Sequence, residues 1–461
     1  MARDDMSSKL KAESKQLKVV PAVVTCVLLF CCLQTTPDCS PSSEDRTTMT
    51  ETMISLPRLV STCADAARRG CVVIRSVQAR REAVLADAAT TSSNGTAADA
   101  LREASRHGIQ YKVDGDPRSA LTEADGAAQE VILHCLRARW GSDLHIVGEE
   151  EEEGEGGGST CNDEEQEDVF ARYGVLRPEE VALKEDILVS ASSSNGSSEQ
   201  DVPLSSVTIY VDPMDGTREF VEGRLGNVQC LVGVVVDGRP VGGAVGLPFA
   251  GGRTETQEGK RGCDIPSIQV VHALLGEQPT LGRVSVSNGS SSTFDELPFL
   301  APAAEDRSAS TTTSSSGRQL IVLSGDSRKP EKDLAIDHLR DICSDEGVEL
   351  DIRTAGGCGT KIMQLALCAA AASTGGDGTD AIAVMTRGNC SWDTAAPTAV
   401  LEAALQQAAG TGRVSDFYGD RLVYDGVNVT NNLAVLASCG ADTKRWHTEL
   451  CKRLAKDKAV G

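Results

Sequence analysis

The chain has 461 residues, a formal net charge of −22 and sixteen cysteines. Its length is sufficient for two packed domains with loose segments attached. The acidic excess argues against a nucleic-acid backbone or an anionic membrane surface as the main partner. The cysteines are scattered and form no C-x-x-C pair, which favours buried, reduced thiols over a disulfide framework.

Residues 1–50 are predicted to form an N-terminal extension. Its apolar run, Val19 to Leu33, follows four lysines. As a helix this run would span roughly 22 Å at ~1.5 Å per residue, which is less than the ~30 Å of a hydrocarbon core. The pattern is typical of a targeting sequence or a signal anchor, and an extension without such a role is the alternative. We therefore expect a cytoplasmic or organellar protein, with membrane association only if this run is an anchor.

Periodic segments follow, separated by polar stretches that are typical of surface insertions. The insertions cover residues 90–97, 149–168, 192–199 and 285–317. In the first half we predict helices over 54–89 and 123–140, strands over 144–148 and 207–217, and a hairpin over 228–249. Asp237 and Gly238, a favoured tight-turn pair, join the two hairpin strands.

From residue 319 the pattern changes to an alternation of strands and helices. Strands are predicted over 320–325, 349–354 and 381–386, and helices over 329–344, from Thr360 and from Thr394. Such alternation indicates an α/β architecture. We therefore predict a helix-plus-antiparallel-sheet domain over residues 51–260 and an α/β domain over residues 261–461.

The strongest local signal is "VDPMDGTREF", in which Asp212 and Asp215 flank a proline at the end of an apolar strand. Pro213 favours a turn that points both carboxylates to one side. Gly216 and Thr217 are expected to open a helix whose free amides offer an edge for a phosphate. Carboxylates beside an anion site require a hard cation between them, and Mg²⁺ is the usual choice. The alternative is a solvated Asx-type turn.

Four motifs together resemble the lithium-sensitive, magnesium-dependent phosphatases, which include inositol monophosphatase, fructose-1,6-bisphosphatase and 3'(2'),5'-bisphosphate nucleotidase. The motifs are "LTEAD" (Leu121–Asp125), "IVGEE" (Ile146–Glu150), "VDPMDGT" (Val211–Thr217) and "WDTAAP" (Trp392–Pro397). The resemblance covers residues 56–456 and is strongest to the bisphosphate nucleotidase subfamily, through residues 212–249 and "GGCGTKIMQL" (Gly356–Leu365). It implies a layered α/β/α/β/α sandwich with the active site between the two halves.

The resemblance also implies roles for individual residues, with two or three Mg²⁺ ions as cofactors. The implied metal ligands are Glu149, Asp212, the backbone carbonyl of Met214, Asp215 and Asp393. Asp125 and Thr217 correspond to the pair that positions and deprotonates the attacking water. Read alone, Asp125 and Asp393 could instead be helix-capping acids.

The run of glutamates leaves open whether Glu149 or Glu150 is the ligand; the expectation is Glu149, with Glu150 supporting the site through water or an outer contact. For the substrate, the implied contacts are Gly216, Thr217, Ser324, Gly325, Ser327, Arg328, Gly357 and Lys361. In "LSGDSRK", Arg328 stands where the subfamily has a histidine, and its fork of donors suits a phosphate.

The function that the resemblance implies is Mg²⁺-dependent hydrolysis of the 3'-phosphate of adenosine 3',5'-bisphosphate, with 3'-phosphoadenylyl sulfate as a second substrate. Sensitivity to lithium and a role in sulfur metabolism are expected with it. A small phosphorylated nucleotide is the expected partner, and nucleic acid is not. The alternatives are an inositol phosphate phosphatase, which would share the metal site, and a catalytically inactive nucleotide-binding sensor.

Overall fold

The computed structural model describes residues 51–91, 109–111, 120–150, 168–178, 200–250, 267–286, 295–297, 318–373, 379–430 and 434–460. The predicted targeting segment, Val19 to Leu33, and most residues of the four predicted insertions lie outside these ranges. Within the described residues, no helix combines the length and the apolar character needed to cross a membrane.

The larger sheet has seven strands and is antiparallel except for the pairing of β4 with β6. Its strands, in order across the sheet, are β11 (Asp295–Leu297), β10 (Thr280–Val286), β9 (Ser267–Leu274), β8 (Arg239–Ala250), β7 (Gln229–Val236), β6 (Val207–Asp215) and β4 (His145–Gly148). The turn between β7 and β8 has positive φ at both Asp237 and Gly238, as a type I′ turn requires. This confirms the predicted hairpin.

Two long helices cover one face of this sheet. They are α1 (Leu56–Thr91) and α3 (Glu123–Trp140), close to the two predicted ranges. Leu59, Ala67 and Cys71 of α1 are fully buried, because the apolar residues of α1 recur at helical spacing and so share one face. They join α3 and the sheet in one hydrophobic cluster.

The smaller sheet has five strands, with parallel pairings of β13 with β12 and of β12 with β14 and antiparallel pairings beyond. Its strands, in order, are β13 (Glu349–Thr354), β12 (Gln319–Ser324), β14 (Asp380–Met385), β16 (Val435–Cys439) and β15 (Gly412–Asp416). The predicted strands of this half are confirmed. The parallel part of the sheet agrees with the predicted strand and helix alternation.

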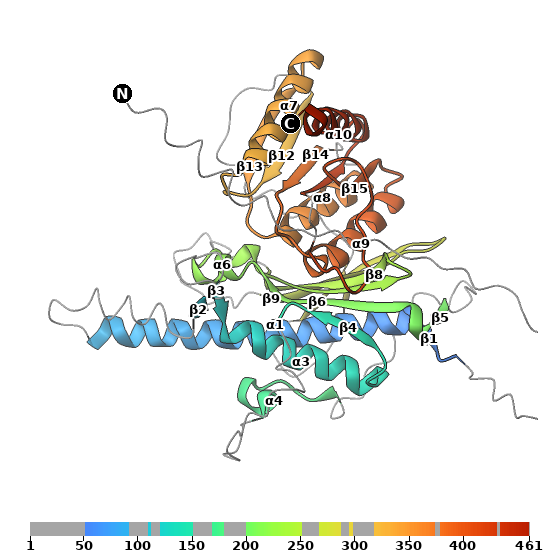
Figure 1. Cartoon of the computed structure of the whole chain (residues 1–461). Helices are drawn as coiled ribbons and strands as arrows, with labels where there is room; N and C mark the ends of the chain where they lie inside the picture. Colours follow the sequence, from blue (N-terminus) through green and yellow to red (C-terminus); the bar gives the residue numbers. More distant parts are fainter. Residues whose placement is uncertain are drawn as a thin grey trace, which may run out of the picture. The chain divides into compact units, whose positions relative to one another are not determined.

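Helices lie on both faces of the smaller sheet. α8 (Cys358–Ser373) and α9 (Ser391–Gln407) pack between the two sheets, whereas α7 (Pro330–Glu346) and α10 (Thr443–Val460) pack on the outer face. Figure 1 shows the resulting order of layers, from α1 and α3 to α7 and α10. This confirms the predicted α/β/α/β/α sandwich. One hydrophobic cluster contains residues of both sheets, such as Leu231 and Leu323, and the predicted domain boundary near residue 260 stays a prediction.

Two predicted helices begin earlier than expected, at Cys358 rather than Thr360 and at Ser391 rather than Thr394. In α9 the start is fixed by a capping box, in which the Cys390 amide donates to the Asp393 carboxylate. The remaining short elements are β1 (Met53–Ser55), β2 (Ile109–Tyr111), β3 (Ala120–Thr122), α4 (Val169–Tyr173), β5 (Asp201–Pro203), η3 (Leu204–Ser206), α6 (Thr217–Val221) and η4 (Leu225–Asn227). Of these, α6 begins at Thr217, as predicted.

Candidate active site

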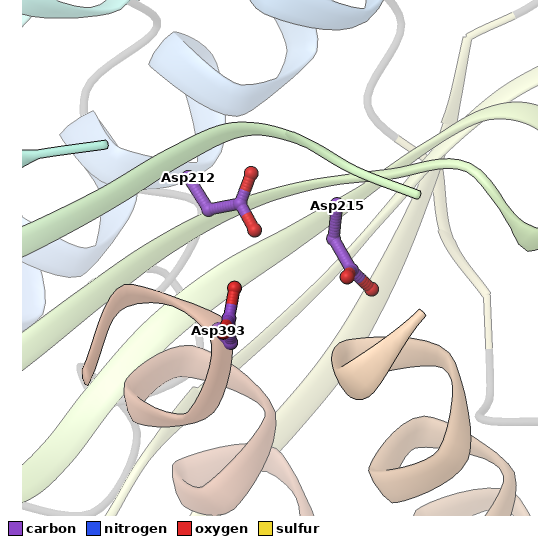
Figure 2. Close-up of side chains that lie close together, drawn as sticks. All are labelled: Asp212, Asp215 and Asp393. Carbon is purple, nitrogen blue, oxygen red and sulfur yellow. The ribbon is translucent and has the colours of Figure 1, made fainter. Parts of the chain in front are cut away.

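The end of strand β6 carries two carboxylates that reach the same space. Residues three apart on a regular strand point to opposite faces, but the pairing of β6 with β7 is irregular between Asp212 and Asp215. Pro213 lies in this stretch and has no amide hydrogen for the ladder. The irregularity therefore re-aims the side chains, and Figure 2 shows both carboxylates near Asp393. The Met214 amide donates to Asp212 Oδ1 over 3.0 Å and holds that carboxylate in place.

The third carboxylate comes from the other half of the fold. Asp393 lies in the first turn of α9, where one of its oxygens accepts the Cys390 amide at 2.5 Å. Asp212, Asp215 and Asp393 each offer an oxygen within 4.8 Å of the others. Hard carboxylate oxygens that converge in this way are the ligands that Mg²⁺ uses in proteins. The structure thus brings together residues 181 positions apart in the sequence.

The electrostatics of this cluster favour a bound cation. Burial raises the pKa of Asp212 well above its usual range, and the charges of Glu149, Asp215 and Asp393 raise it further. Burial also raises the pKa of Asp215, although Lys361 and two backbone amides oppose the shift. The pKa of Asp393 is raised by burial and by Asp215. Without a cation, the cluster therefore favours the protonated forms of its carboxyl groups, and a divalent ion fits the donor set.

Glu149 adds a further negative charge beside the cluster. The backbones of Glu149 and of its neighbour Glu150 are held by different partners. The Glu149 amide donates to the Val211 carbonyl over 3.0 Å, which extends the pairing of β4 with β6 by one residue. Its charge acts on Asp125 and on all three clustered aspartates. The backbone of Glu150 is held instead by the side chain of Gln129, through bonds of 2.6 and 3.1 Å. The Glu149 side chain shares a hydrogen bond with Asp212, but it does not belong to the group of three aspartates whose oxygens lie within 4.8 Å of one another.

Asp125 and Thr217 lie in direct contact. The Thr217 hydroxyl lies 2.9 Å from Asp125 Oδ1 and 3.2 Å from the Met214 carbonyl. The other oxygen of Asp125 accepts bonds from the Thr122 amide and hydroxyl at 2.7 and 2.8 Å, which forms the capping box of α3. Burial raises the pKa of Asp125 to about 7, although the bonds from Thr122 oppose the shift. Asp125 is thus a capping residue whose other carboxylate oxygen contacts Thr217 beside the cluster.

A cavity of about 590 Å³ opens beside the carboxylates. Among the predicted substrate contacts, those that line it are Gly216, Gly325, Ser327, Gly357 and Lys361. Thr217, Ser324 and Arg328 do not line it; Ser324 is buried and Arg328 is exposed. Lys329, the next residue, lines the cavity and donates to the Arg387 carbonyl.

The loop before α8 and the first turn of α8 form one wall, and that first turn holds Asp215. The amides of Cys358 and Thr360 donate to its two oxygens over 3.1 and 3.3 Å. Gly357 has φ of +66°, and a Cβ there would lie 2.6 Å from Asp215 Oδ2. Only glycine fits this close approach without strain. Two of the amides at the N-terminus of α8 are therefore engaged by a carboxylate of the protein.

Several lining residues were missed from the sequence. Arg218 pairs with Asp326 across the cavity over 2.7 Å and with Glu222 over 2.8 Å. Arg224 pairs with Glu219 over 2.6 Å, and Arg387 also lines the cavity. Arg218 follows "DGT" directly, and that position was a usable signal. Arg224 lies within residues 212–249, where the resemblance gave it no role, and Arg387 lies in a segment without any motif. Gln129, which holds Glu150 outside the cavity, follows "LTEAD" by four residues and was also given no role.

Comparison with known proteins finds related sequences. The chain is 31% identical to 3'(2'),5'-bisphosphate nucleotidase 1 of Dictyostelium discoideum over 142 residues, which is 31% of this chain and 38% of that protein. It is 26% identical to the Mus musculus protein of the same name over 234 residues, 50% of this chain and 57% of that protein. The matches thus span about half of these curated relatives or less.

Among solved structures, CysQ from Bacteroides thetaiotaomicron, described as a bacterial member of the inositol monophosphatase family, is 16% identical with a TM-score of 0.42. The match covers 83% of this chain and 97% of that one. The model of the inositol monophosphatase family matches residues 82–458, which include all the predicted site residues. This confirms the family predicted from the four motifs, and the chain belongs to the inositol monophosphatase family.

Proposed function

We propose that this protein is a Mg²⁺-dependent phosphatase that removes the 3'-phosphate of adenosine 3',5'-bisphosphate and of 3'-phosphoadenylyl sulfate. Family membership and the names of the two relatives support hydrolysis of a phosphate monoester. The observation that favours a substrate with a second anionic group is the charge distribution of the cavity, which is lined by Asp215 and Asp393 and also by Lys329 and Arg387. The choice of an adenosine compound over an inositol bisphosphate rests on the names of the relatives.

The metal would be held by Glu149, Asp212, the Met214 carbonyl, Asp215 and Asp393, and we propose two or three Mg²⁺ ions. When bound, such ions neutralise charge on phosphoryl oxygens and lower the pKa of a coordinated water. The donor set fits this role because it is rich in oxygen, converges within 4.8 Å at three aspartates and is strongly self-repelling when empty.

Asp125 and Thr217 would prepare the attacking water. The Thr217 hydroxyl gives its hydrogen to Asp125 Oδ1, so its lone pairs are free to accept a hydrogen bond from a water. Oδ2 of Asp125 is fixed by Thr122, which holds the carboxylate while it takes up the proton of that water. A pKa of about 7 suits a group that must accept a proton near neutral pH.

The cations of the cavity favour a substrate with two phosphates. Arg218 and Arg224 are neutralised by the neighbouring acids described above. Lys329 and Arg387 make no ion pair with a carboxylate of the described residues. A second phosphate would supply that missing charge, whereas an inositol monophosphate would not. The volume of about 590 Å³ lies within the usual range for sites that enclose a small ligand.

A substrate panel tests this function. Phosphate release is measured from adenosine 3',5'-bisphosphate, 3'-phosphoadenylyl sulfate, inositol 1-phosphate and inositol 1,4-bisphosphate, with and without Mg²⁺ and Li⁺. We expect Mg²⁺-dependent, Li⁺-inhibited turnover with the adenosine compounds preferred. A tenfold or greater preference for an inositol phosphate, about 1.4 kcal/mol in transition-state binding, would favour the inositol phosphatase alternative instead.

The inactive-sensor alternative is tested by the same panel with a binding measurement added. A sensor would bind adenosine 3',5'-bisphosphate in calorimetry and release no phosphate at any Mg²⁺ concentration. The Asp212→Asn variant is the matched control, because it removes one ligand charge with little change in volume. We expect it to bind Mg²⁺ weakly and to lack turnover.

A further inference from the structure

Arg81 is a buried arginine on α1 with few partners. Its residue is 8% exposed. The guanidinium donates one long bond, from Nη1 to the Phe220 carbonyl at 3.4 Å, and lies 4.9 Å from the centre of the Phe220 ring. Nε has no hydrogen-bond partner. Among the described residues no carboxylate pairs with Arg81.

Such an arrangement is costly for the empty protein. A guanidinium has five N–H donors and is always charged at physiological pH. A buried guanidinium with one long hydrogen bond and one ring contact is costly to the fold, because these contacts replace only part of the hydration energy that burial removes. Burial accordingly lowers the pKa of Arg81, and no nearby acid opposes this shift. A charged residue kept under these conditions is most simply explained by a partner that binds from solution.

A cavity of about 300 Å³ lies beside Arg81. Its lining among the described residues is Val77, Arg80, Arg81, Ala83, Val84, Thr122 and Glu123. Glu123 is already engaged, since its Oε1 accepts from Arg80 at 3.4 Å and from the Tyr173 hydroxyl at 2.6 Å. One positive charge therefore remains in excess, and it belongs to Arg81.

We propose that this cavity binds a small tetrahedral oxyanion, namely phosphate, sulfate or the phosphate group of a small ester. A guanidinium suits such a group because it offers parallel donors in a planar fork. The apolar side chains of Val77 and Val84 limit the space around the anion and exclude part of the water, which strengthens the charge interaction. This site is separate from the substrate cavity and does not depend on catalysis.

The proposed anion site lies next to residues that hold Asp125 and Thr217 in place. Thr122, which holds Asp125 Oδ2, lines the Arg81 cavity. The Phe220 carbonyl that accepts from Arg81 belongs to α6, the helix that begins at Thr217. An anion in this cavity therefore lies beside Thr122, and the arginine that would hold it is bonded to α6, so binding can be transmitted to both segments that position the proposed water-activating pair.

Phosphate binding in the absence of Mg²⁺ tests the proposal. The full chain is titrated with inorganic phosphate in EDTA, and Tm and calorimetric heat are recorded; sulfate and glycerol 3-phosphate are separate arms that distinguish a free anion from an ester. We expect saturable binding that raises Tm. In Arg81→Met, which keeps the stem packed on Phe220, affinity for the anion should fall at least tenfold. Without anion, the variant should melt at the same temperature as the native chain or above it.

Two controls separate this site from the substrate cavity. Asp212→Asn should retain the phosphate response, because it alters only the carboxylate cluster. Arg80→Met removes a lining arginine that is already paired with Glu123, and its effect should be smaller than that of Arg81→Met. If Arg81→Met fails to fold, Arg81→Lys replaces it and should weaken binding while keeping the charge. An unchanged response in the Arg81 variants, or no response in the native chain, would overturn the proposal.

Discussion

The hydroxyl of Thr217 lies 2.9 Å from Oδ1 of Asp125, 92 residues away in the sequence, and joins the first turn of α6 to the first turn of α3. This bond fixes which way the hydroxyl hydrogen points. Thr217→Ala removes the hydroxyl, so a water beside Asp125 loses its orientation. We expect kcat to fall about a hundredfold or more, the lower range for a positioned proton-transfer group, while Mg²⁺ affinity measured by calorimetry stays unchanged.

Thr217→Ser is the matched variant for this prediction, because it keeps the hydroxyl and removes only a methyl group. It should recover most of the turnover lost in Thr217→Ala. Equal losses in both variants would show that the threonine acts through packing and not through its hydroxyl.

Glu149 and Glu150 are adjacent residues of the same type, so matched variants of the two test which one binds the metal. The charge of Glu149 acts on the three aspartates, whereas Gln129 holds the backbone of Glu150. We expect Glu149→Gln to weaken Mg²⁺ binding about a hundredfold, since even outer partners of ligands cost about 10–100-fold. Glu150→Gln should change the affinity by about tenfold at most, the lower end of the range for an outer partner. The reverse order would move the ligand assignment to Glu150.

The features that could be predicted from the sequence are those set by contiguous residues. Asp237 and Gly238 predict the hairpin, because the turn requires positive φ at these two residues themselves. The motifs around Asp125 and Asp212 are also short stretches of contiguous residues. The resemblance to a known family indicated that such motifs, in this order along the chain, belong to one site. What could not be predicted depends on distant contacts. Gln129 meets Glu150 only because α3 packs beside β4.

The lining of the substrate cavity also could not be predicted residue by residue from the sequence. In the loop after β12 the cation predicted to contact the substrate was Arg328, yet Lys329 lines the cavity and Arg328 does not. Which of two adjacent side chains faces inward depends on the turn before α7, where Lys329 has extended φ and ψ and precedes Pro330. A periodic pattern is absent in so short a segment, so the sequence cannot assign the direction of either side chain.

The stability conferred by Mg²⁺ should depend on pH. In the metal-free protein the folded-state pKa of Asp125 is about 7, raised from an ordinary value of 3.8, and the three clustered aspartates are also raised. Groups of this kind stabilise the fold fully below the ordinary pKa, and that contribution is lost as pH rises through the folded-state pKa. Between about pH 4 and pH 8 the metal-free protein therefore loses this contribution, because its carboxylates ionise without a counter-charge.

Bound Mg²⁺ supplies that counter-charge, so the rise in Tm on adding Mg²⁺ should be small near pH 5 and large near pH 8. The rise is the difference between Tm with Mg²⁺ and Tm without it. Groups that titrate in the same way in both forms contribute nothing to this difference; His272, whose pKa is lowered to about 4 by burial, is one of them. In the Asp212→Asn variant, the rise in Tm on adding Mg²⁺ should be small at both pH values. A rise of equal size at both pH values would contradict the metal assignment.

Lys329 and Arg328 offer the sharpest test of the substrate cavity, because they are adjacent cations of which only Lys329 lines it. If the second phosphate of adenosine 3',5'-bisphosphate is bound there, Lys329→Met removes a charge-assisted contact worth about 1.5–3 kcal/mol. We therefore expect KM for this substrate to rise about tenfold or more, with a smaller change for a substrate that has one phosphate. Arg328→Met should leave KM within about twofold, as for an exposed position. Loss of affinity in Arg328→Met alone would mean that the loop turns its other side chain to the substrate, and the assignment of the cavity wall would have to be reversed.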